Sequence, residues 1–266
     1  MSSSTSAAAH RWTEALGRWG IPEHILHQAP QSPWIHPVES FRPSGNLHVD
    51  TPSRHRALEV LTGDTPSVLD VGCGGGRGAL GLVPPARSVV GVDHQQSMLD
   101  VFADEATARG VRAQMVLGDW PDVAEHTPVC DVVVCHHVFY NVRDLVPFAA
   151  ALTSHARARV VVELPEHHPL SHLSDGWKRF WDLDRPVEPT AYDALDVLRS
   201  MGLDAHAEPF TVGSDGPPPD VSDLDVEHTR IRLCLPPSRD PEVREFLEQR
   251  PQRPRHLVTL WWNTSN

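Results

Sequence analysis

Residues 68–78 read VLDVGCGGGRG, an apolar run that passes directly into a loop with four glycines in the five positions 72–76. Such a β-branched run is typical of a strand that is buried on both faces. Glycine permits positive backbone φ angles in the turn and lets a ligand come close, because it has no Cβ. We therefore expect a buried strand, a ligand-binding turn and then a helix over Gly76–Leu82.

The same order of strand and helix repeats along the middle of the chain. The runs that predict strands are Ser67–Val71, Ser88–Asp93, Ala113–Leu117, Asp131–Cys135 and Arg159–Leu164. The segments that predict helices between them are Gly76–Leu82, Gln95–Arg109 and Val142–His155. Alternation at this pitch indicates right-handed βαβ units, and hence an α/β fold with a doubly wound, mostly parallel sheet.

The two ends of the chain are richer in proline and predict a mixture of elements. We expect helices over Arg11–Trp19, from the N-cap Thr51 to about Leu61, and over Thr190–Met201. Further strands are predicted over Leu203–Val212 and His256–Trp262. This pattern divides the chain into an N-terminal cap, residues 1–50, and a core, residues 51–266, with insertions at about 165–189 and 213–255.

Charge and composition restrict the partners. The 266 residues include 23 Lys+Arg and 35 Asp+Glu, so the net charge of −12 disfavours nucleic acids and anionic lipids. The longest apolar run, Leu145–Leu152, is too short to span a bilayer, and the N-terminal MSSSTSAAAH lacks the pattern of a secretory signal. Four cysteines without a CxxC pair do not suggest a disulfide framework. These features predict a soluble, cytoplasmic protein that binds neither nucleic acid nor membrane.

The glycine loop has two possible interpretations. Gly76-x-Gly78-x-x-Gly81 satisfies the dinucleotide pattern, but it begins inside the expected helix, too late to receive a pyrophosphate at the helix N-terminus. The alternative register is Asp70-x-Gly72-x-Gly74-x-Gly76, which places an acid two residues before the first glycine. An acid beside the loop is unfavourable for a pyrophosphate but suits a cationic ligand.

This second register resembles the first motif of the class I S-adenosylmethionine-dependent methyltransferases. Two further landmarks of that family follow in order: Asp93 ends the next strand, and Gly118-Asp119-Trp120 follows the third. The resemblance extends from residue 51 to about 212. It implies a Rossmann-like sheet of seven strands, the last one antiparallel, and S-adenosyl-L-methionine as the cofactor.

The resemblance also implies which residues contact that cofactor. They are Asp70, Gly72, Cys73, Gly74, Asp93, His94, Gly118, Asp119, Trp120 and His136. By this resemblance Asp93 would bond the ribose hydroxyls, and Asp119 would take the adenine amino group while Trp120 lies against the purine. Asp70 has an equally good alternative role, that of accepting hydrogen bonds from loop amides. The alternative for Asp119 is a purely structural Gly-Asp turn, which would give the same sequence.

Candidates for acceptor chemistry follow the fourth and fifth strands, where open α/β sheets bind their ligands. They are His136, His137 and Glu163, and we expect one of the two histidines to face the cleft while the other turns away. Methyl transfer needs a base only if the acceptor must lose a proton; the alternative role for each residue is loop packing. His168 and His172 have the spacing of a helical metal pair, but Pro169 interrupts it, so no metal site is predicted.

The substrate class follows by exclusion. There is no D/N-P-P-Y/F motif after the fourth strand and no Pro-Cys nucleophile pair, so we expect a small-molecule acceptor, methylated on oxygen or nitrogen. Two alternatives are a non-catalytic, methyltransferase-like binding protein and an NAD(P)-dependent oxidoreductase. Five tryptophans either line the acceptor pocket or anchor the segments that cover it: Trp12, Trp19, Trp34, Trp177 and Trp181.

Overall fold

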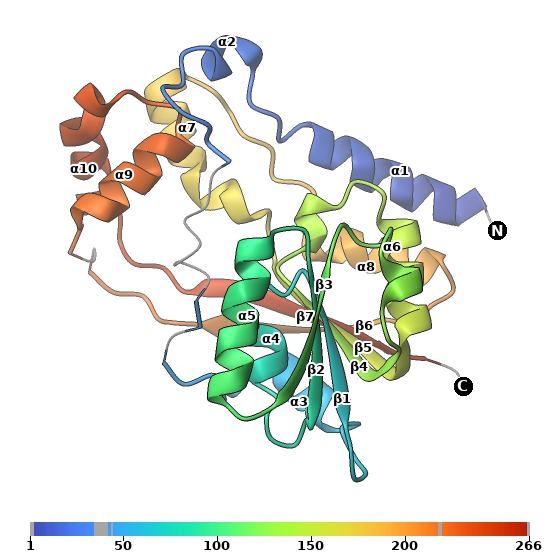
Figure 1. Cartoon of the computed structure of the whole chain (residues 1–266). Coiled ribbons are helices and arrows are strands. Elements are labelled where there is room, and N and C mark those ends of the chain that lie inside the picture. Colours follow the sequence, from blue (N-terminus) through green and yellow to red (C-terminus); the bar gives the residue numbers. More distant parts are fainter. Residues whose placement is uncertain (1–2, 35–41, 44, 218–219, 265–266) are drawn as a thin grey trace.

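The computed structural model describes residues 3–34, 42–43, 45–217 and 220–264, and these residues contain a seven-stranded sheet (Figure 1). The strands are β1 (Ser67–Val71), β2 (Ser88–Asp93), β3 (Arg112–Leu117), β4 (Cys130–His136), β5 (Ala156–Pro165), β6 (His206–Val212) and β7 (Arg255–Asn263). Their order is β3-β2-β1-β4-β5-β7-β6. Only β7 runs antiparallel to its neighbours β5 and β6. The predicted α/β fold, mostly parallel with an antiparallel last strand, is therefore confirmed.

Strand limits agree with the prediction within one residue, except for β5 and β6. β5 begins at Ala156, three residues before the predicted Arg159. β6 begins at His206 and not at Leu203. The preceding helix ends at Ser200, Gly202 follows it with a φ of 85°, and the amide of Leu203 donates to the carbonyl oxygen of Leu198, 3.3 Å away. Leu203 therefore belongs to the helix cap, in which its amide is already bonded.

Helices cover both faces of the sheet. They are α1 (Ser3–Gly17), α2 (Glu23–Leu26), α3 (Pro52–Leu58), α4 (Arg77–Leu80), α5 (Gln96–Ala108), α6 (Leu145–His155), α7 (Ser174–Trp181), α8 (Ala191–Ser200), α9 (Asp223–Arg232) and α10 (Asp240–Glu248). One core cluster packs α1, α6 and α8 against one face, and a second packs α3, α4 and α5 against the other (Figure 1). Thr51 is the N-cap of α3, as predicted; its hydroxyl accepts from the amide of Arg54.

Three helix predictions need correction. The helix expected over Arg11–Trp19 runs instead from Ser3 to Gly17, because the alanines at positions 7–9 favour helix and Ala8, Trp12 and Leu16 are buried in the first core cluster. The helix expected over Gly76–Leu82 covers only Arg77–Leu80, since Pro84 and Pro85 follow and lack the amide hydrogen that a helix needs. The helix expected from Val142 begins at Leu145, because Val142 is extended.

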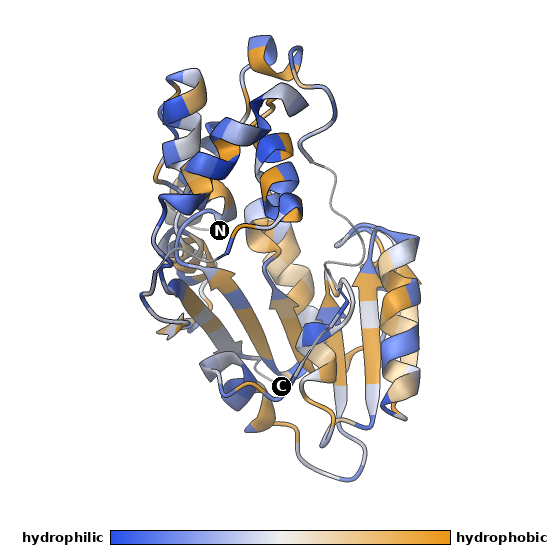
Figure 2. Ribbon diagram, turned by 90° about the vertical axis from the view of Figure 1, so that its left-hand side faces the viewer, coloured by the Kyte–Doolittle hydropathy of each residue, from blue (hydrophilic) through white to orange (hydrophobic). Residues whose placement is uncertain are grey.

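A third core cluster lies outside the two faces of the sheet. Ile25 of α2, Trp177 of α7, Leu233 just after α9 and Val243 of α10 are buried in it. These helices gather on one side of the molecule, and Figure 2 shows apolar residues concentrated along the strands whereas this helical group alternates between hydrophilic and hydrophobic. No helix within the described residues is long and apolar enough to cross a membrane.

Candidate functional site

The glycine loop after β1 is held tightly against β2. The amides of Gly72 and Cys73 both donate to the carbonyl oxygen of Val92, at 2.8 and 3.0 Å. Gly72 has a φ of 70° and Gly76, the N-cap of α4, a φ of 90°. A Cβ at Gly76 would lie 2.6 Å from the ring of Phe102, so both the backbone conformation and the packing there require glycine.

Asp93 at the end of β2 connects the loop to the next turn. One carboxylate oxygen accepts from the amide of Gly74 at 3.0 Å, and the other accepts from the amide of Gln95 at 3.0 Å. Only 8% of Asp93 is exposed. Because each carboxylate oxygen has a second lone pair, Asp93 retains two acceptor sites for the hydroxyls of a ligand.

Asp70 is buried beneath the loop and accepts from the amide of Ala79 at 2.9 Å. Burial raises the pKa of Asp70 to about 7, against the effect of the Ala79 amide, and the nearby Asp93 raises it further. Of the two roles that the sequence left open for Asp70, the hydrogen bond from Ala79 supports that of accepting from backbone amides, here in the first turn of α4 rather than in the loop.

The third predicted landmark lies at the end of β3. The amide of Gly118 donates to the backbone carbonyl of Asp93 at 3.0 Å, so the ends of β2 and β3 are tied together. Asp119 is exposed, and the indole Nε1 of Trp120 donates to the carbonyl oxygen of Phe148 at 3.3 Å. This bond fixes the orientation of the Trp120 ring beside Asp119.

All these groups line one cavity of about 1130 Å³ at the carboxyl ends of the parallel strands. Every residue that the sequence analysis named for the cofactor lies along it, as do His137 and Glu163. Their contribution to cofactor binding stays a prediction. Several lining residues were not predicted from the sequence, among them Ser53, Arg54, Gln95, Met98, Phe210, Arg255 and Leu257. Gln95 and Met98 follow Asp93 closely in sequence, whereas nothing in the sequence connects Ser53 or Arg255 with the loop.

His136 and His137 both line the cavity, which corrects the prediction that one would turn away. His137 has a φ of 62°, in the left-handed region, and its Nε2 lies 3.4 Å from Oε1 of Glu163 on the neighbouring strand. An extended backbone would alternate the two side chains between the faces of the sheet, and the left-handed turn at His137 breaks that alternation.

The Nε2 atom of His136 is buried and has no hydrogen-bond partner in the part of the chain that the structure describes. Burial lowers the pKa of His136, the nearby Glu163 opposes this effect, and His137 adds to it. The imidazole is therefore neutral at pH 7, and its buried Nε2 is unpartnered within the described residues.

Glu163 lies between two hydrogen-bond donors. The hydroxyl of Ser53 on α3 donates to one carboxylate oxygen, and His137 approaches the other. Burial alone would raise the pKa of Glu163, but the hydrogen bond from His137, the nearby His136 and the hydrogen bond from Ser53 outweigh it and lower the pKa to about 2. A carboxylate with so low a pKa is a weak base, so the geometry favours an orienting role for Glu163 over proton abstraction.

Comparison with known proteins identifies the family. Residues 68–158, which span the glycine loop and strands β1 to β4, match the family model described as a methyltransferase domain. This matched part of the chain is a methyltransferase domain, and its glycine loop and sheet are those of the class I S-adenosylmethionine-dependent methyltransferases. S-adenosylmethionine is the cofactor of this family.

Individual relatives are more distant. A ubiquinone biosynthesis O-methyltransferase of Coxiella burnetii is 29% identical over 112 residues, or 42% of this methyltransferase and 47% of the relative. The chain thus spans about half the length of the first curated relatives it matches. A protein of the same name from Rhizobium rhizogenes is 25% identical over 201 residues, covering 64% of this chain and 80% of its own.

A solved structure agrees in fold. Magnesium protoporphyrin IX methyltransferase from Synechocystis PCC 6803, with bound S-adenosylhomocysteine, covers 98% of this methyltransferase and 99% of its own chain. The TM-score is 0.51 at 16% sequence identity, so the likeness concerns the fold.

Most of the tryptophans serve this methyltransferase as anchors. The indole nitrogens of Trp12, Trp19 and Trp181 donate to the carbonyl oxygens of Val142, Glu188 and Leu233, at 2.8, 2.6 and 2.7 Å. Trp177 is buried in the third core cluster. None of these four lines the cavity; of the five, only Trp34, 51% exposed, does so. For Trp12, Trp19, Trp177 and Trp181 the anchoring role is therefore correct and the pocket-lining role is wrong.

His168, which follows β5, packs against an aromatic ring instead of forming the metal pair whose spacing it shares with His172. His168 stacks on Trp19 with ring centroids 3.9 Å apart, and its Nδ1 accepts from the amide of Leu170. Burial lowers the pKa of His168 to about 4, and the nearby Arg185 lowers it further. Among the residues that the structure describes, no group of three or more His, Cys, Asp or Glu side chains is arranged to hold a metal ion.

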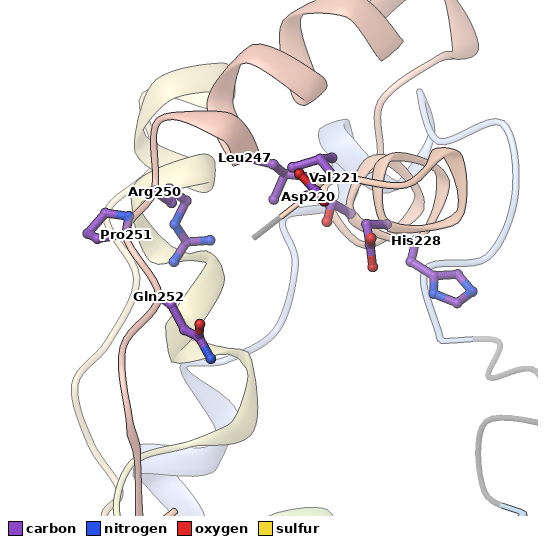
Figure 3. Close-up of a pocket in the computed structure, with 9 residues that line it drawn as sticks. Asp220, Val221, His228, Leu247, Arg250, Pro251 and Gln252 are labelled. Carbon is purple, nitrogen blue, oxygen red and sulfur yellow. The ribbon is translucent and has the colours of Figure 1, made fainter. Parts of the chain in front are cut away.

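A second, smaller hollow of about 380 Å³ lies beside α9 and α10 (Figure 3). Two of its polar side chains already have partners: Asp225 forms a capping box with Ser222, and Arg250 donates to the carbonyl oxygen of His172. It also lacks a glycine loop. The larger cavity is therefore the candidate active site of the methyltransferase.

Proposed function

We propose that this protein transfers a methyl group from S-adenosylmethionine to an oxygen or nitrogen atom of a small-molecule acceptor. The observation that supports this most is the continuity of the cavity, which joins the glycine loop and Asp93 at one end to His136, His137 and Glu163 beyond it. The relatives named as O-methyltransferases support transfer to oxygen.

The residues at the cofactor end fit S-adenosylmethionine. The loop at Gly72–Gly74 offers backbone at close range, Asp93 retains acceptor sites for the ribose hydroxyls, and Asp119 and Trp120 lie where the purine would be held. The carboxylates of Asp93 and Asp119 also favour a cationic ligand. When bound, this cofactor supplies an activated methyl group on a positively charged sulfur.

We propose that His136 is the base that takes the proton from the acceptor. In the transfer, the acceptor atom forms a bond to the methyl carbon, the carbon–sulfur bond breaks, and its electron pair stays on sulfur. A hydroxyl acceptor must lose its proton, and the neutral His136, with its buried and unused Nε2, is suited to take it. His137 and Glu163 would orient the acceptor beside it, while the walls of the cavity limit the access of water.

The N-terminal cap and the two insertions would enclose the acceptor. We propose that residues 1–50, together with the segments at about 165–189 and 213–255, form this cover over the core of residues 51–266. The support is the third core cluster, to which α2, α7, α9 and α10 all contribute.

Titration calorimetry with S-adenosylmethionine, S-adenosylhomocysteine and NADH separates the three classes of function. We expect both methionine derivatives to bind and NADH not to bind. Asp93→Ala should weaken the binding of S-adenosylhomocysteine at least about tenfold, because it removes hydrogen bonds to a charged group. Asp100→Ala, at an exposed acid on α5 outside the cavity, is the matched control. Unchanged affinity in Asp93→Ala would contradict the assigned cofactor site.

A non-catalytic binding protein is tested separately. A panel of phenols and aryl amines is incubated with S-adenosylmethionine, and release of S-adenosylhomocysteine is measured. Binding of the cofactor with no acceptor-dependent release across the panel would favour the non-catalytic alternative.

A further inference from the structure

Beyond Glu163, the cavity is lined by one face of the sheet. The register of the strands shows which side chains lie on that face. His136 pairs with Glu163, Glu163 with Thr259, Leu257 with Phe210, and Arg255 with Val212. Paired residues point to the same face of a sheet, and so do residues two apart along a strand. His136, Glu163, Leu257 and Arg255 are therefore on the face that α3 covers in part.

This outer surface is apolar. Leu257 is 5% exposed, Phe210 and Val212 are partly buried, and all three line the cavity. Trp34, from the N-terminal segment, also lines it and is 51% exposed. Aromatic and aliphatic side chains that line the same cavity favour a flat, apolar occupant.

Arg255 ends this surface with a positive charge. Its side chain lines the cavity and has no hydrogen bond or ion pair with any residue in the described ranges. The other charged groups nearby are already engaged: Glu163 accepts from Ser53 and lies beside His137, and Arg54 donates to the carbonyl oxygen of Gly81. The cavity thus has carboxylates at the cofactor end and an unpaired guanidinium at the opposite end.

The positions of the strands set the length of an occupant that reaches both ends. From His136 on β4 to Arg255 on β7 there are two inter-strand steps of about 4.8 Å each, and Arg255 lies four residues along β7 from the Thr259 that pairs with Glu163, or roughly 13 Å. The two backbones are therefore about 16 Å apart, part of which the two side chains fill. Because side chains stand roughly perpendicular to a sheet, an occupant must span most of this distance, which two linked rings do and a single ring does not.

We propose that the acceptor has an elongated aromatic body and a carboxylate, and that Arg255 binds the carboxylate while the opposite end meets His136. This inference rests on the proposed function, since it assigns an acceptor to the same cavity. It sets the substrate class as an aromatic hydroxy acid whose hydroxyl and carboxylate are at opposite ends.

The test uses the full chain saturated with S-adenosylhomocysteine and three compounds. These are 4′-hydroxybiphenyl-4-carboxylate, 4-hydroxybiphenyl, which lacks the carboxylate, and 4-hydroxybenzoate, which lacks one ring. In calorimetry we expect the two-ring acid to bind at least about tenfold more tightly than either of the others, the effect of one charge-assisted contact.

Three variants assign that preference to Arg255. Arg255→Ala should reduce the affinity for the two-ring acid about tenfold and leave that for 4-hydroxybiphenyl unchanged, while Arg255→Lys should retain most of the affinity. Arg253→Ala, at an exposed arginine nearby that does not line the cavity, is the matched control and should behave as the wild type.

The possible outcomes separate the two proposals. If S-adenosylhomocysteine does not bind, the proposed function fails. If it binds, but the wild type shows no preference for the two-ring acid or binds none of the three compounds, the acceptor inference is overturned. An equal loss of affinity for both biphenyls in Arg255→Ala would also overturn it.

Discussion

At the scale of single residues, the environment of His136 distinguishes it from its neighbour. His136 is neutral with a buried and unpaired Nε2, whereas His137 is oriented toward a carboxylate. A neutral imidazole can accept a proton, and an imidazole beside a carboxylate is better suited to hold that carboxylate in position. The two adjacent histidines, which the sequence could not distinguish, thus lie in different chemical environments.

We expect His136→Gln to lower kcat about 10²- to 10⁴-fold for any hydroxyl acceptor found in the panel, because the substitution removes the proposed base. The affinity for S-adenosylhomocysteine should stay within about twofold of the wild-type value. The wild-type rate should rise with pH through a pKa below the usual value for histidine, and the variant should lose this dependence.

Exposed His126, which does not line the cavity, gives the control His126→Gln. A variant at His136 that keeps the wild-type pH profile, or that loses cofactor affinity in parallel with kcat, would show that His136 does not act as the base.

At the scale of elements, the end of each parallel strand was predictable from sequence and the distant walls of the cavity were not. Asp93 and Gly118 end β2 and β3, so the adjacency of strands in a βαβ fold brings them to the glycine loop. Ser53 and Arg255 reach the same cavity through the register of β5 with β7 and the packing of α3. No local pattern in the sequence encodes such long-range contacts.

Gly76 in the glycine loop and Gly63 outside it form a matched pair that tests why glycine is needed in the loop. Gly76 and Gly63 have φ angles of 90° and 89°, but a Cβ at Gly76 would meet Phe102 and Leu80, whereas nothing lies within 4 Å at Gly63. Gly63→Ala should cost about 1 kcal/mol of unfolding free energy from backbone strain alone. Gly76→Ala should cost about 2–4 kcal/mol, because the clash adds to the strain.

Urea unfolding monitored by circular dichroism measures both losses. Equal losses in the two variants would mean that the packing against Phe102 relaxes freely, and that only the backbone conformation demands glycine at Gly76.

At the scale of the whole molecule, the N-terminal segment is tied to the region after β5 by aromatic and backbone contacts. Trp19 stacks on His168 and donates to the carbonyl oxygen of Glu188, and Arg185 donates to the carbonyl oxygens of Trp19 and Gly20. The tryptophans could be recognised from sequence as anchors or as pocket walls, but only the tertiary contacts decide between the two. The proposed cover over the cavity would therefore be held by contacts at a distance from the cavity.

His168 makes this attachment sensitive to acid. Burial lowers its pKa from 6.5 to about 4, so the folded state favours the neutral ring. The stability that depends on the neutral ring is fully present above pH 6.5 and is lost as the pH falls from 6.5 to 4, by about 3 kcal/mol at most.

His168→Phe keeps an aromatic ring against Trp19 but removes the charge, and the hydrogen bond from Leu170 is lost equally at every pH. We expect hydrogen exchange in α1 and α2 to accelerate between pH 7 and 4 in the wild type and in the control His24→Phe, at an exposed histidine, beyond the intrinsic pH dependence of exchange. The acceleration should be largely absent in His168→Phe, and an equal acceleration in all three proteins would assign the acid sensitivity to other groups.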